Sequence, residues 1–528
     1  MAKNPVGKNA VFDVCIVGSG AGGGTLAAHL AHRGVKVAVV EGGPVVNTRT
    51  DFNTHALPSD YPNRHIPTMK DGKYGYGSER ARGVGGKTML WNAVALRFSQ
   101  RDFKGYTIDG AGADWPIDYL DMAPYYERIE REVGVCGNHD GLTDLPDGIF
   151  LKPPPLKRGD LLLQRGGKKI GIPIIHTRKA TLTRANHTRP ACHYCGNCMA
   201  GCDVAAKYNS ADVHLNPAMK TGRLTVFSDS IVREVMVSKE NRATGVRYFH
   251  RVTGEEGEIH ARAVAVACAC IQSVGLLLMS VSSLYPQGLA NSSGQLGRNF
   301  IPHFNSGVTG FLTEMIGQPV VNDEGFIDHA YLPSYMHAQT RDYARSFGVQ
   351  VYTGISRTTG WAREVPGFGV AYKQRVKERF PAYVTFQCFG EMLANAQSFI
   401  QLDPIAKDEF GLPRVKATAV QGENEHKIYD AMTKAAVDLL QESGGEVLSV
   451  SDFKVPTFNH QLGGCSMGSD PRSSVVDKYC RTHDVPNLYV VDGSVFPSSS
   501  EKNPTLTIMA LAARTADHLG DRLRKGDV

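Results

Sequence analysis

Residues 11–43 read VFDVCIVGSGAGGGTLAAHLAHRGVKVAVVEGG, and this stretch decides the fold. The apolar run at residues 11–17 predicts a strand, the helix formers at 25–33 predict a helix, and the apolar run at 35–40 predicts a second strand. A strand, a helix and a strand in this order form the βαβ unit of a dinucleotide-binding fold. The sequence therefore predicts an α/β protein with a Rossmann-like domain.

Glycines with the spacing Gly-x-Gly-x-x-Gly join the first strand to the helix. Gly18 permits the tight turn, Gly20 lets a pyrophosphate approach the backbone, and Gly23 lets the helix pack closely on the strand. The helix N-terminus then holds the phosphates. Glu41 ends the second strand about twenty residues later, where an acid accepts hydrogen bonds from a ribose diol. The stretch predicts a nucleotide site, but it does not separate NAD from FAD.

The composition describes a large globular chain. With 528 residues, of which 42% are hydrophobic, it can bury a sizeable core and is expected to form two or more domains. Its net charge of +6 is spread over 58 basic and 52 acidic residues, so we expect a solvated surface and no nucleic-acid partner. No apolar run approaches the ~20 residues of a membrane span, and the first fifteen residues lack the pattern of an export signal.

The chain order predicts a discontinuous nucleotide domain. A second glycine turn, Gly85-Gly86, leads into Trp91-Asn92, which suggests another approach of the backbone to a cofactor. Residues 303–456 alternate between apolar and polar and predict an antiparallel sheet, which we interpret as a second domain at 303–456. Residues 457–528 return to the strand-loop-helix style of residues 1–302, so they are expected to complete the first domain.

Several further elements are predicted from local patterns. Residues 119–133 and 423–443 predict helices, and residues 47–79 a long covering loop. Residues 224–237 and 243–250 alternate like strands of a small hairpin layer, and residues 261–270 predict a buried strand that runs into a helix at 271–280. The segment 398–402 is assigned to the antiparallel sheet of the second domain.

A cysteine-rich segment at residues 190–210 predicts a metal site. Its spacing, Cys192-x2-Cys195-x2-Cys198-x3-Cys202, is the run associated with iron–sulfur clusters in ferredoxins, although Asp203 stands where the proline would be. A structural zinc held by four thiolates is the main alternative, but zinc sites usually separate two C-x2-C pairs by a longer loop. A disulfide pair fits less well, because the chain has an odd number of cysteines, 11.

Three separated segments together resemble the glucose-methanol-choline (GMC) family of flavin oxidoreductases. The first is the N-terminal nucleotide unit, and the second is the Gly85-Gly86 turn with Trp91-Asn92. The third consists of NHQLGGCSMG at 459–468, NLYVVDGS at 487–494 and NPTLTI at 503–508. The resemblance implies an FAD-binding domain at 1–302 and 457–528, with a substrate domain between them.

The same resemblance implies an active site. A histidine at the position of His460 stands over the flavin as a base, and the position of Asn503 holds its histidine or asparagine partner. The implied chemistry is oxidation of an alcohol, in which the base takes the hydroxyl proton while hydride leaves to flavin N5. Asn503 cannot titrate, so it would orient the substrate oxygen and stabilise the developing alkoxide.

The resemblance also assigns residues to the cofactor. Asn92 is expected beside the isoalloxazine, Asp492 and Gly493 at the ribityl and pyrophosphate region, and Val226 near the adenine. One branch of the family carries a covalent flavin on a histidine immediately before the tryptophan. That position is Leu90 here, so we expect non-covalent FAD.

Some dehydrogenases of this family resemble the cysteine segment as well. They carry a three-iron cluster on cysteines spaced C-x5-C-x3-C, which matches Cys192, Cys198 and Cys202. Cys195 is then either a spare thiol or the fourth ligand of a four-iron cluster, so the cluster is [3Fe-4S] or [4Fe-4S]. A one-electron relay of this kind connects a two-electron flavin to a cytochrome and favours a dehydrogenase over an oxidase.

The resemblance favours a sugar or glycoside as the substrate. It implies oxidation of a hydroxyl to give a keto sugar, with C3 as one candidate position. The predicted substrate domain offers aromatic and hydrogen-bonding side chains that suit a carbohydrate: His329, Tyr331, Tyr335, His337, Tyr352, Trp361, Tyr372, Gln387 and Glu391. Expected partners are a small subunit bearing an export signal and a cytochrome acceptor. The enzyme would then be periplasmic through co-export, or else cytoplasmic.

Two other functions stay open. One is an oxygen-using alcohol oxidase with structural zinc on its cysteines. The other is a non-catalytic flavin-binding subunit of an electron-transfer complex.

Overall fold

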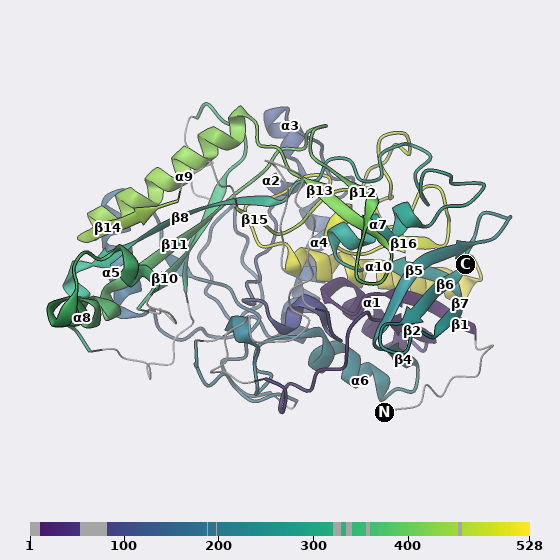
Figure 1. Ribbon diagram of the computed structural model, residues 1–528, viewed down its shortest axis with the longest axis horizontal. Coiled ribbons are helices and arrows are strands. Elements are labelled where there is room, and N and C mark those ends of the chain that lie inside the picture. Colours follow the sequence, from purple (N-terminus) through teal and green to yellow (C-terminus); the bar gives the residue numbers. More distant parts are fainter. Residues whose placement is uncertain are drawn as a thin grey trace.

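The computed structural model describes residues 11–52, 82–186, 188–196, 198–319, 329–333, 341–354, 360–451 and 457–528. Most of the predicted covering loop at 47–79 lies outside these ranges. Within them, the strands form two seven-stranded sheets, which lie toward opposite ends of the long axis, and a separate two-stranded ribbon (Figure 1). No helix in this part of the chain has the length and apolar character that crossing a bilayer requires.

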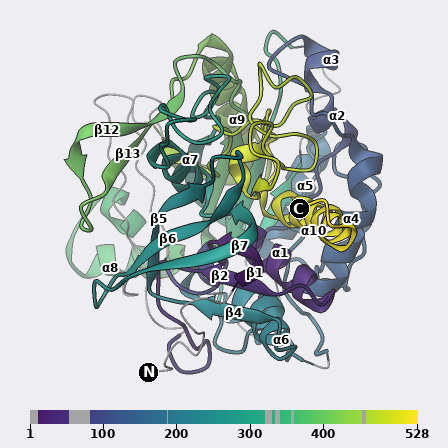
Figure 2. The same cartoon turned by 90° about the vertical axis from the view of Figure 1, so that its right-hand side faces the viewer.

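The first sheet is built around the N-terminal βαβ unit. Its order is β4-β2-β1-β7-β6-β5, with β16 also pairing with β7, and Figure 2 shows these strands side by side. The strands are β1 (Val11–Val17), β2 (Val37–Val40), β4 (Leu224–Phe227), β5 (Ser230–Val237), β6 (Ala243–His250), β7 (Glu256–Val266) and β16 (Leu488–Val490). β1 runs parallel to β2 and β7, as the βαβ prediction requires.

The helix of this unit, α1 (Ala21–His32), begins four residues earlier than the sequence predicts. Its first turns contain Gly22, Gly23 and Gly24. Glycine has a low helix propensity, so the local sequence does not indicate that the helix begins at Ala21. Packing explains them: a Cβ on Gly22 would lie 2.0 Å from the Val491 carbonyl oxygen, and one on Gly24 would lie 1.7 Å from Ser210 Oγ. Tertiary contact therefore outweighs local preference here.

The second sheet is antiparallel, as predicted. Its order is β14-β8-β11-β10-β9-β3, with β15 also pairing with β8, and helix α9 (Glu423–Glu442) packs against β8, β11 and β14 (Figure 1). The strands are β3 (Ile175–His176), β8 (His303–Leu312), β9 (Ala330–Leu332), β10 (Phe347–Thr353), β11 (Tyr383–Gly390), β14 (Gly445–Val450) and β15 (Thr457–Asn459). β3 precedes residue 303 and β15 follows residue 456, so the flanking segments also contribute strands to this sheet.

Two strand predictions need correction. β4 is not part of a hairpin layer: it pairs in parallel with β2, whereas only β5 and β6 form the hairpin. The segment 398–402 lies in β12 (Phe399–Lys407), which pairs with β13 (Pro413–Thr418) as a separate ribbon against α7 (Cys270–Met279). Alternation shows that one face of a strand is buried, but it does not show which partner buries it.

The remaining helices cover the two sheets. They are α2 (Gln100–Phe103), α3 (Gly105–Asp109), α4 (Tyr119–Val133), α5 (Arg158–Lys169), α6 (Asn216–Met219), α8 (Gly369–Arg379) and α10 (Thr505–Lys525). α4 has the predicted bounds and is capped by Asp118, whose side chain accepts from Asp121 N. α10 packs on α1 and α4, so the last helix closes the first sheet's outer layer. One cluster of buried apolar side chains runs through both sheets.

The glycines of the first turn give a matched pair of tests. A Cβ on Gly23 would lie 2.0 Å from the Gly18 carbonyl oxygen, whereas one on Gly20 would meet no atom within 4 Å. We expect Gly23→Ala to lower the free energy of unfolding by about 3 kcal/mol, and Gly20→Ala by less than about 1 kcal/mol. Urea unfolding of the two variants beside the parent protein measures both changes, and equal losses would contradict the packing role of Gly23.

Candidate active site

The predicted catalytic pair is in contact. His460 follows β15, Asn503 precedes α10, and Asn503 Nδ2 lies 2.9 Å from His460 Nε2. His460 has a φ of +46°, in the left-handed region that costs a non-glycine residue about 1–3 kcal/mol. The surrounding loops therefore hold His460 in a strained backbone conformation that aims its ring at Asn503.

A chain of hydrogen bonds extends from this pair into the second sheet. Gln350 Nε2 donates to Asn503 Oδ1 over 3.0 Å, and Tyr352 Oη donates to Gln350 Oε1 over 3.1 Å. Asn92 Nδ2 donates to Tyr352 Oη over 2.9 Å, and Lys179 Nζ donates to Asn92 Oδ1 over 3.2 Å. The chain thus joins both predicted catalytic residues to Asn92, the residue expected beside the isoalloxazine.

The direction of this chain determines the tautomer of His460. The ammonium of Lys179 can only donate, so each amide and hydroxyl along the chain accepts on the side of Lys179 and donates on the side of His460. Asn503 Nδ2 therefore donates to His460 Nε2, which carries a lone pair, and the proton of His460 sits on Nδ1. His460 Nδ1 then donates to His303 Nδ1 over 2.9 Å.

His303 was not among the sequence predictions. It begins β8 and is fully buried, and burial lowers its pKa to about 4, although the Ser500 carbonyl acts in the opposite direction. Burial, the neighbouring His303 and Lys87 together lower the pKa of His460 well below 6.5. Both imidazoles are therefore neutral at pH 7, and His460 is ready to accept a proton.

Gln350 and Lys179 were also missed. Gln350 is 2% exposed in the otherwise apolar run of β10, and a buried polar side chain in such a strand is a signal that the sequence did offer. Lys179 is 1% exposed and lies in an irregular segment with no recognisable pattern. Only the folded chain brings it to Asn92.

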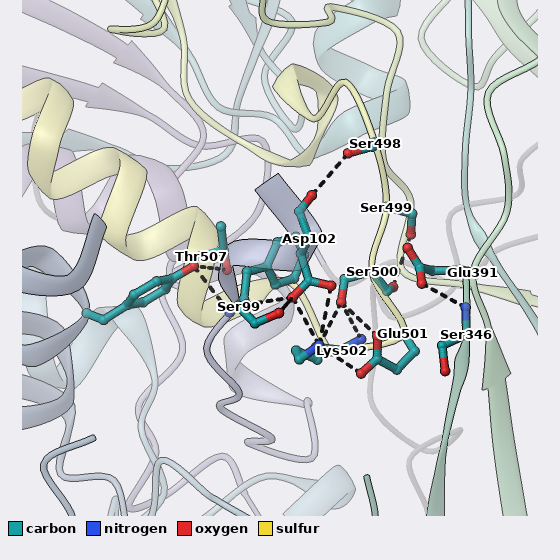
Figure 3. A network of polar contacts seen from close by, with 12 residues as sticks. Ser99, Asp102, Ser346, Glu391, Ser498, Ser499, Ser500, Glu501, Lys502 and Thr507 are labelled. Carbon is teal, nitrogen blue, oxygen red and sulfur yellow. Dashed lines mark hydrogen bonds and ion pairs between the residues drawn. The ribbon is translucent and has the colours of Figure 1, made fainter. Parts of the chain in front are cut away.

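A buried charge cluster holds the loop that ends in Asn503 (Figure 3). Lys502 Nζ lies 3.0 Å from Asp102 Oδ2 and 2.8 Å from Glu501 Oε1, and it also donates to Ser500 Oγ. Burial disfavours charge on Lys502, but the two carboxylates outweigh it and raise the pKa of Lys502. The neighbour of Asn503 is thereby fixed to α2, which limits the freedom of the amide that contacts His460.

The candidate substrate residues divide into groups. Tyr352 belongs to the hydrogen-bonded chain, the His329 ring lies tilted against it with ring centroids 4.8 Å apart, and Gln387 pairs with Gln350 across β10 and β11. Four other candidate residues do not belong to this series of hydrogen bonds. Trp361 and Tyr372 belong to a separate small core, Tyr331 is buried in a third cluster, and Glu391 accepts from Ser346 N. Tyr335 and His337 lie outside the described residues.

The first glycine turn forms a cradle at the start of α1. Gly18 has a φ of +99°, and the space beside Gly20 is open. The second turn, Gly85-Gly86, meets the first: Gly85 N donates to Ser19 Oγ over 2.9 Å, and a Cβ on Gly86 would lie 3.0 Å from Gly20 Cα. An open backbone at a helix N-terminus suits the pyrophosphate of FAD.

The other predicted cofactor residues line the same end of the first sheet. Glu41 follows β2 and accepts from Ser19 Oγ (2.6 Å) and Gly43 N (3.1 Å), while burial raises its pKa. Val226 lies on β4 directly beside β2. Asp492 and Gly493 follow β16, and Asp492 accepts from Ser494 N over 2.9 Å. The positions predicted for phosphate, ribose and adenine therefore fit FAD in this arrangement.

The cysteine segment lies against the second glycine turn. Lys207 Nζ donates to the carbonyl oxygens of Met89 (3.1 Å), Trp91 (2.9 Å) and Cys198 (2.6 Å), and Lys179 Nζ lies 3.9 Å from Cys198 Sγ. One buried ammonium thus ties the backbone at Cys198 to the residues just before Asn92.

Cys195 is exposed, whereas Cys192, Cys198 and Cys202 are partly buried. Within the described residues, no three of their sulfur atoms lie within 4.8 Å of one another. A tetrahedral zinc with Zn–S bonds of about 2.3 Å draws its thiolates to within about 4 Å of each other. A mononuclear zinc site would therefore require these side chains to move closer together.

The low pKa of His303 predicts a pH-dependent stability. Because the folded-state pKa of about 4 lies below the ordinary 6.5, protonation favours the unfolded chain, and the stability falls as pH decreases from 6.5 toward 4. Between pH 7.5 and pH 4.5, we expect the free energy of unfolding of His303→Asn to fall by about 2–3 kcal/mol less than that of the parent. Urea unfolding of both proteins at the two pH values tests this, and an identical loss would show that His303 is not buried as a neutral group.

Comparison with known proteins identifies the family. Two family models described as GMC oxidoreductase match the chain, an N-terminal model over residues 21–305 and a C-terminal model over residues 394–512. The 2-methyl-1,2-propanediol dehydrogenase of Mycolicibacterium austroafricanum is 30% identical over 97% of this chain and 95% of that protein. The fructose dehydrogenase large subunit of Gluconobacter japonicus is 28% identical over 97% of this chain and 98% of that protein.

A solved structure shows the same fold. Pyridoxine 4-oxidase of Mesorbium loti superposes with a TM-score of 0.70 at 17% sequence identity, covering 96% of this chain and 99% of that one. The N-terminal family model alone matches more than half of the present chain. The chain therefore belongs to the GMC oxidoreductase family.

Proposed function

We propose that this oxidoreductase is an FAD-dependent dehydrogenase of a sugar or glycoside, oxidising a ring hydroxyl, with C3 as the favoured position, to a keto sugar. The observation that carries the proposal is the His460–Asn503 contact, 2.9 Å long, at the end of a polar chain from the second sheet. In this proposal residues 1–302 and 457–528 bind non-covalent FAD, and residues 303–456 bind the substrate.

His460 acts as the general base. Its Nε2 lone pair is the acceptor to which the substrate hydroxyl gives its proton, and its low pKa keeps that lone pair available at pH 7. The Nδ1 proton, donated to His303, orients the ring during the transfer. FAD supplies the hydride acceptor when bound.

Asn503 and Gln350 position the reacting oxygen. Asn503 Nδ2 is a donor that can turn from His460 to the substrate oxygen and stabilise its developing negative charge. Gln350 donates to Asn503 Oδ1 and so keeps the NH₂ end of the amide facing His460 and the substrate site while it turns. Tyr352, against which the His329 ring is tilted, then offers an aromatic face and a hydroxyl, which suits a carbohydrate ring.

The electron exit is assigned to the cysteine segment. We place a [3Fe-4S] cluster on Cys192, Cys198 and Cys202, or a [4Fe-4S] cluster that also uses Cys195. The spacing of these cysteines along the chain, which is the run associated with iron–sulfur clusters, supports this assignment. The contacts of Lys179 and Lys207 put Cys198 next to the Asn92 turn, which would keep the path from flavin to cluster short.

An external acceptor such as a cytochrome would dock near Cys195, which is exposed. The relative named as the large subunit of fructose dehydrogenase supports an assembly of more than one chain. A small subunit bearing an export signal would bring the enzyme to the periplasm, and without such a subunit it would act in the cytoplasm. Purification of the native complex, followed by cell fractionation, decides between these two arrangements.

Replacing the base tests the chemistry. We expect His460→Ala to lower the rate of flavin reduction by about 10²–10⁴-fold with FAD content unchanged, because general-base catalysis contributes on that order. Anaerobic stopped-flow titration with glucose and methyl glucosides measures the bleaching of the flavin. His32→Ala, at an exposed residue of α1, is the control and should react like the parent. Unchanged reduction in His460→Ala would favour a non-catalytic flavin subunit.

Replacing single cysteines tests the electron exit. We expect Cys198→Ser to retain flavin bleaching by sugar, but to lose most of its iron, its acid-labile sulfide and its reduction of a one-electron acceptor. Cys195→Ser is the matched variant: a three-iron cluster survives this change, and a four-iron cluster does not. Parent protein that lacks iron and sulfide and releases peroxide with oxygen would instead establish an oxidase.

A further inference from the structure

A set of two histidines and one glutamate lies apart from every residue assigned above. His29 comes from α1, Glu132 from α4, and His214 from the π-helical turn Ala211–Leu215. His29 Nε2 lies 2.9 Å from Glu132 Oε2, and His214 Nε2 lies 3.4 Å from the same oxygen. Among the described residues, these form the only group of three or more histidine, cysteine or carboxylate residues whose ligand atoms all lie within 4.8 Å of one another.

The hydrogen bonds around His214 leave its Nε2 atom without a partner. Thr25 Oγ1 gives its only proton to the Ala21 carbonyl over 2.7 Å, so it accepts from His214 Nδ1, 3.2 Å away, when that nitrogen carries the proton. Tyr208 Oη lies 3.0 Å from the same nitrogen and can either accept from it or donate to it. With the proton on Nδ1, the lone pair on Nε2 faces the Glu132 carboxylate. His214 Nε2 is buried and makes no hydrogen bond, and the whole residue is only 4% exposed. In this tautomer two acceptors face each other, an arrangement that a bound cation stabilises and that the tautomer with the proton on Nε2 avoids.

The charge and access of the three groups suit such a cation. The two imidazoles outweigh the effect of burial and lower the pKa of Glu132 to about 2, so its carboxylate is charged. Burial lowers the pKa of His214, which keeps that ring neutral and able to coordinate. The side chain of Glu132 is 32% exposed while that of His29 is 11% exposed, so an ion can enter from the Glu132 side.

The distances match those of transition-metal ligands. Metal–nitrogen and metal–oxygen bonds of about 2.0–2.2 Å in tetrahedral geometry separate the ligand atoms by about 3.4 Å. The observed 3.4 Å for His214 equals this value, and the 2.9 Å for His29 is shorter and would lengthen when an ion enters. Thr25 and Tyr208, both within reach of His214 Nδ1, provide the outer hydrogen bonds that fix the ring of a metal-bound histidine.

We propose that His29, Glu132 and His214 bind one divalent transition-metal ion, Zn²⁺ first among them, with water completing the coordination. Such an ion joins α1, α4 and the π-helical turn. The effect of the ion extends toward the cofactor through Tyr208. The Tyr208 hydroxyl is hydrogen-bonded to His214, and the Tyr208 backbone carbonyl accepts from Trp91 Nε1 over 2.8 Å. The ion would therefore stabilise both the nucleotide-binding helix and the turn that carries Asn92.

Metal titration of chelator-treated full-length protein tests the proposal. We expect calorimetry with Zn²⁺ to show one equivalent more in the parent than in Glu132→Gln, and we expect Zn²⁺ to raise the melting temperature of the parent more than that of His29→Ala. Subtracting the Glu132→Gln variant removes the contribution of the cysteine segment, which is intact in both proteins. His32→Ala, one turn further along α1, should bind like the parent.

A cobalt titration identifies the ligands. Co²⁺ at a site of nitrogen and oxygen ligands lacks the thiolate charge-transfer absorption that cysteine ligands produce, so the difference spectrum between parent and Glu132→Gln should contain only visible d–d bands. Equal stoichiometry and equal spectra in parent, Glu132→Gln and His29→Ala would overturn the proposal. The three residues would then be a hydrogen-bonded cluster only.

Discussion

The arrangement of the active site depends on one group that can only donate hydrogen bonds. Lys179 begins a chain that passes through Asn92, Tyr352, Gln350 and Asn503, and every link inherits its direction from the ammonium. The chain crosses from the cofactor turn to the second sheet and back to the C-terminal loop. A cation at one end therefore determines which nitrogen of His460 carries the proton at the other.

Two further constraints hold His460 in this role. Its backbone is in the left-handed region, and its partner Asn503 follows a lysine that is buried between two carboxylates. Both conditions cost free energy unless the neighbouring structure supports them. The strands β8 and β15 and helix α2 supply that support, so the local strain is a property of the packed protein rather than of the loop alone.

The sequence predicted the parts of the fold and the site that depend on residues close together in the chain or on a family motif. The βαβ unit, the helix at 119–133 and the pairing of His460 with Asn503 follow from local patterns or from the family resemblance, and the first two are confirmed by the structure. His303 and Lys179 could not be found in this way, since each depends on contacts between segments more than 80 residues apart. Gln350 stands out as a polar residue in an apolar strand, but its contact with Asn503 is equally distant in the sequence. The predictions for β4 and for the segment in the β12–β13 ribbon were wrong for the same reason. Alternation indicates burial, whereas strand pairing depends on the whole fold.

The place of β16 in the first sheet has a consequence for how the protein is made. Leu488–Val490 pairs with the buried strand β7, and α10, the last helix of the chain, covers α1. During synthesis the edge of β7 and the apolar face of α1 stay uncovered until β16 and α10 have left the ribosome. An exposed strand edge invites pairing with other chains. The nascent protein therefore keeps this face of α1 and, once β7 has been made, this strand edge uncovered until the C-terminal segment is available.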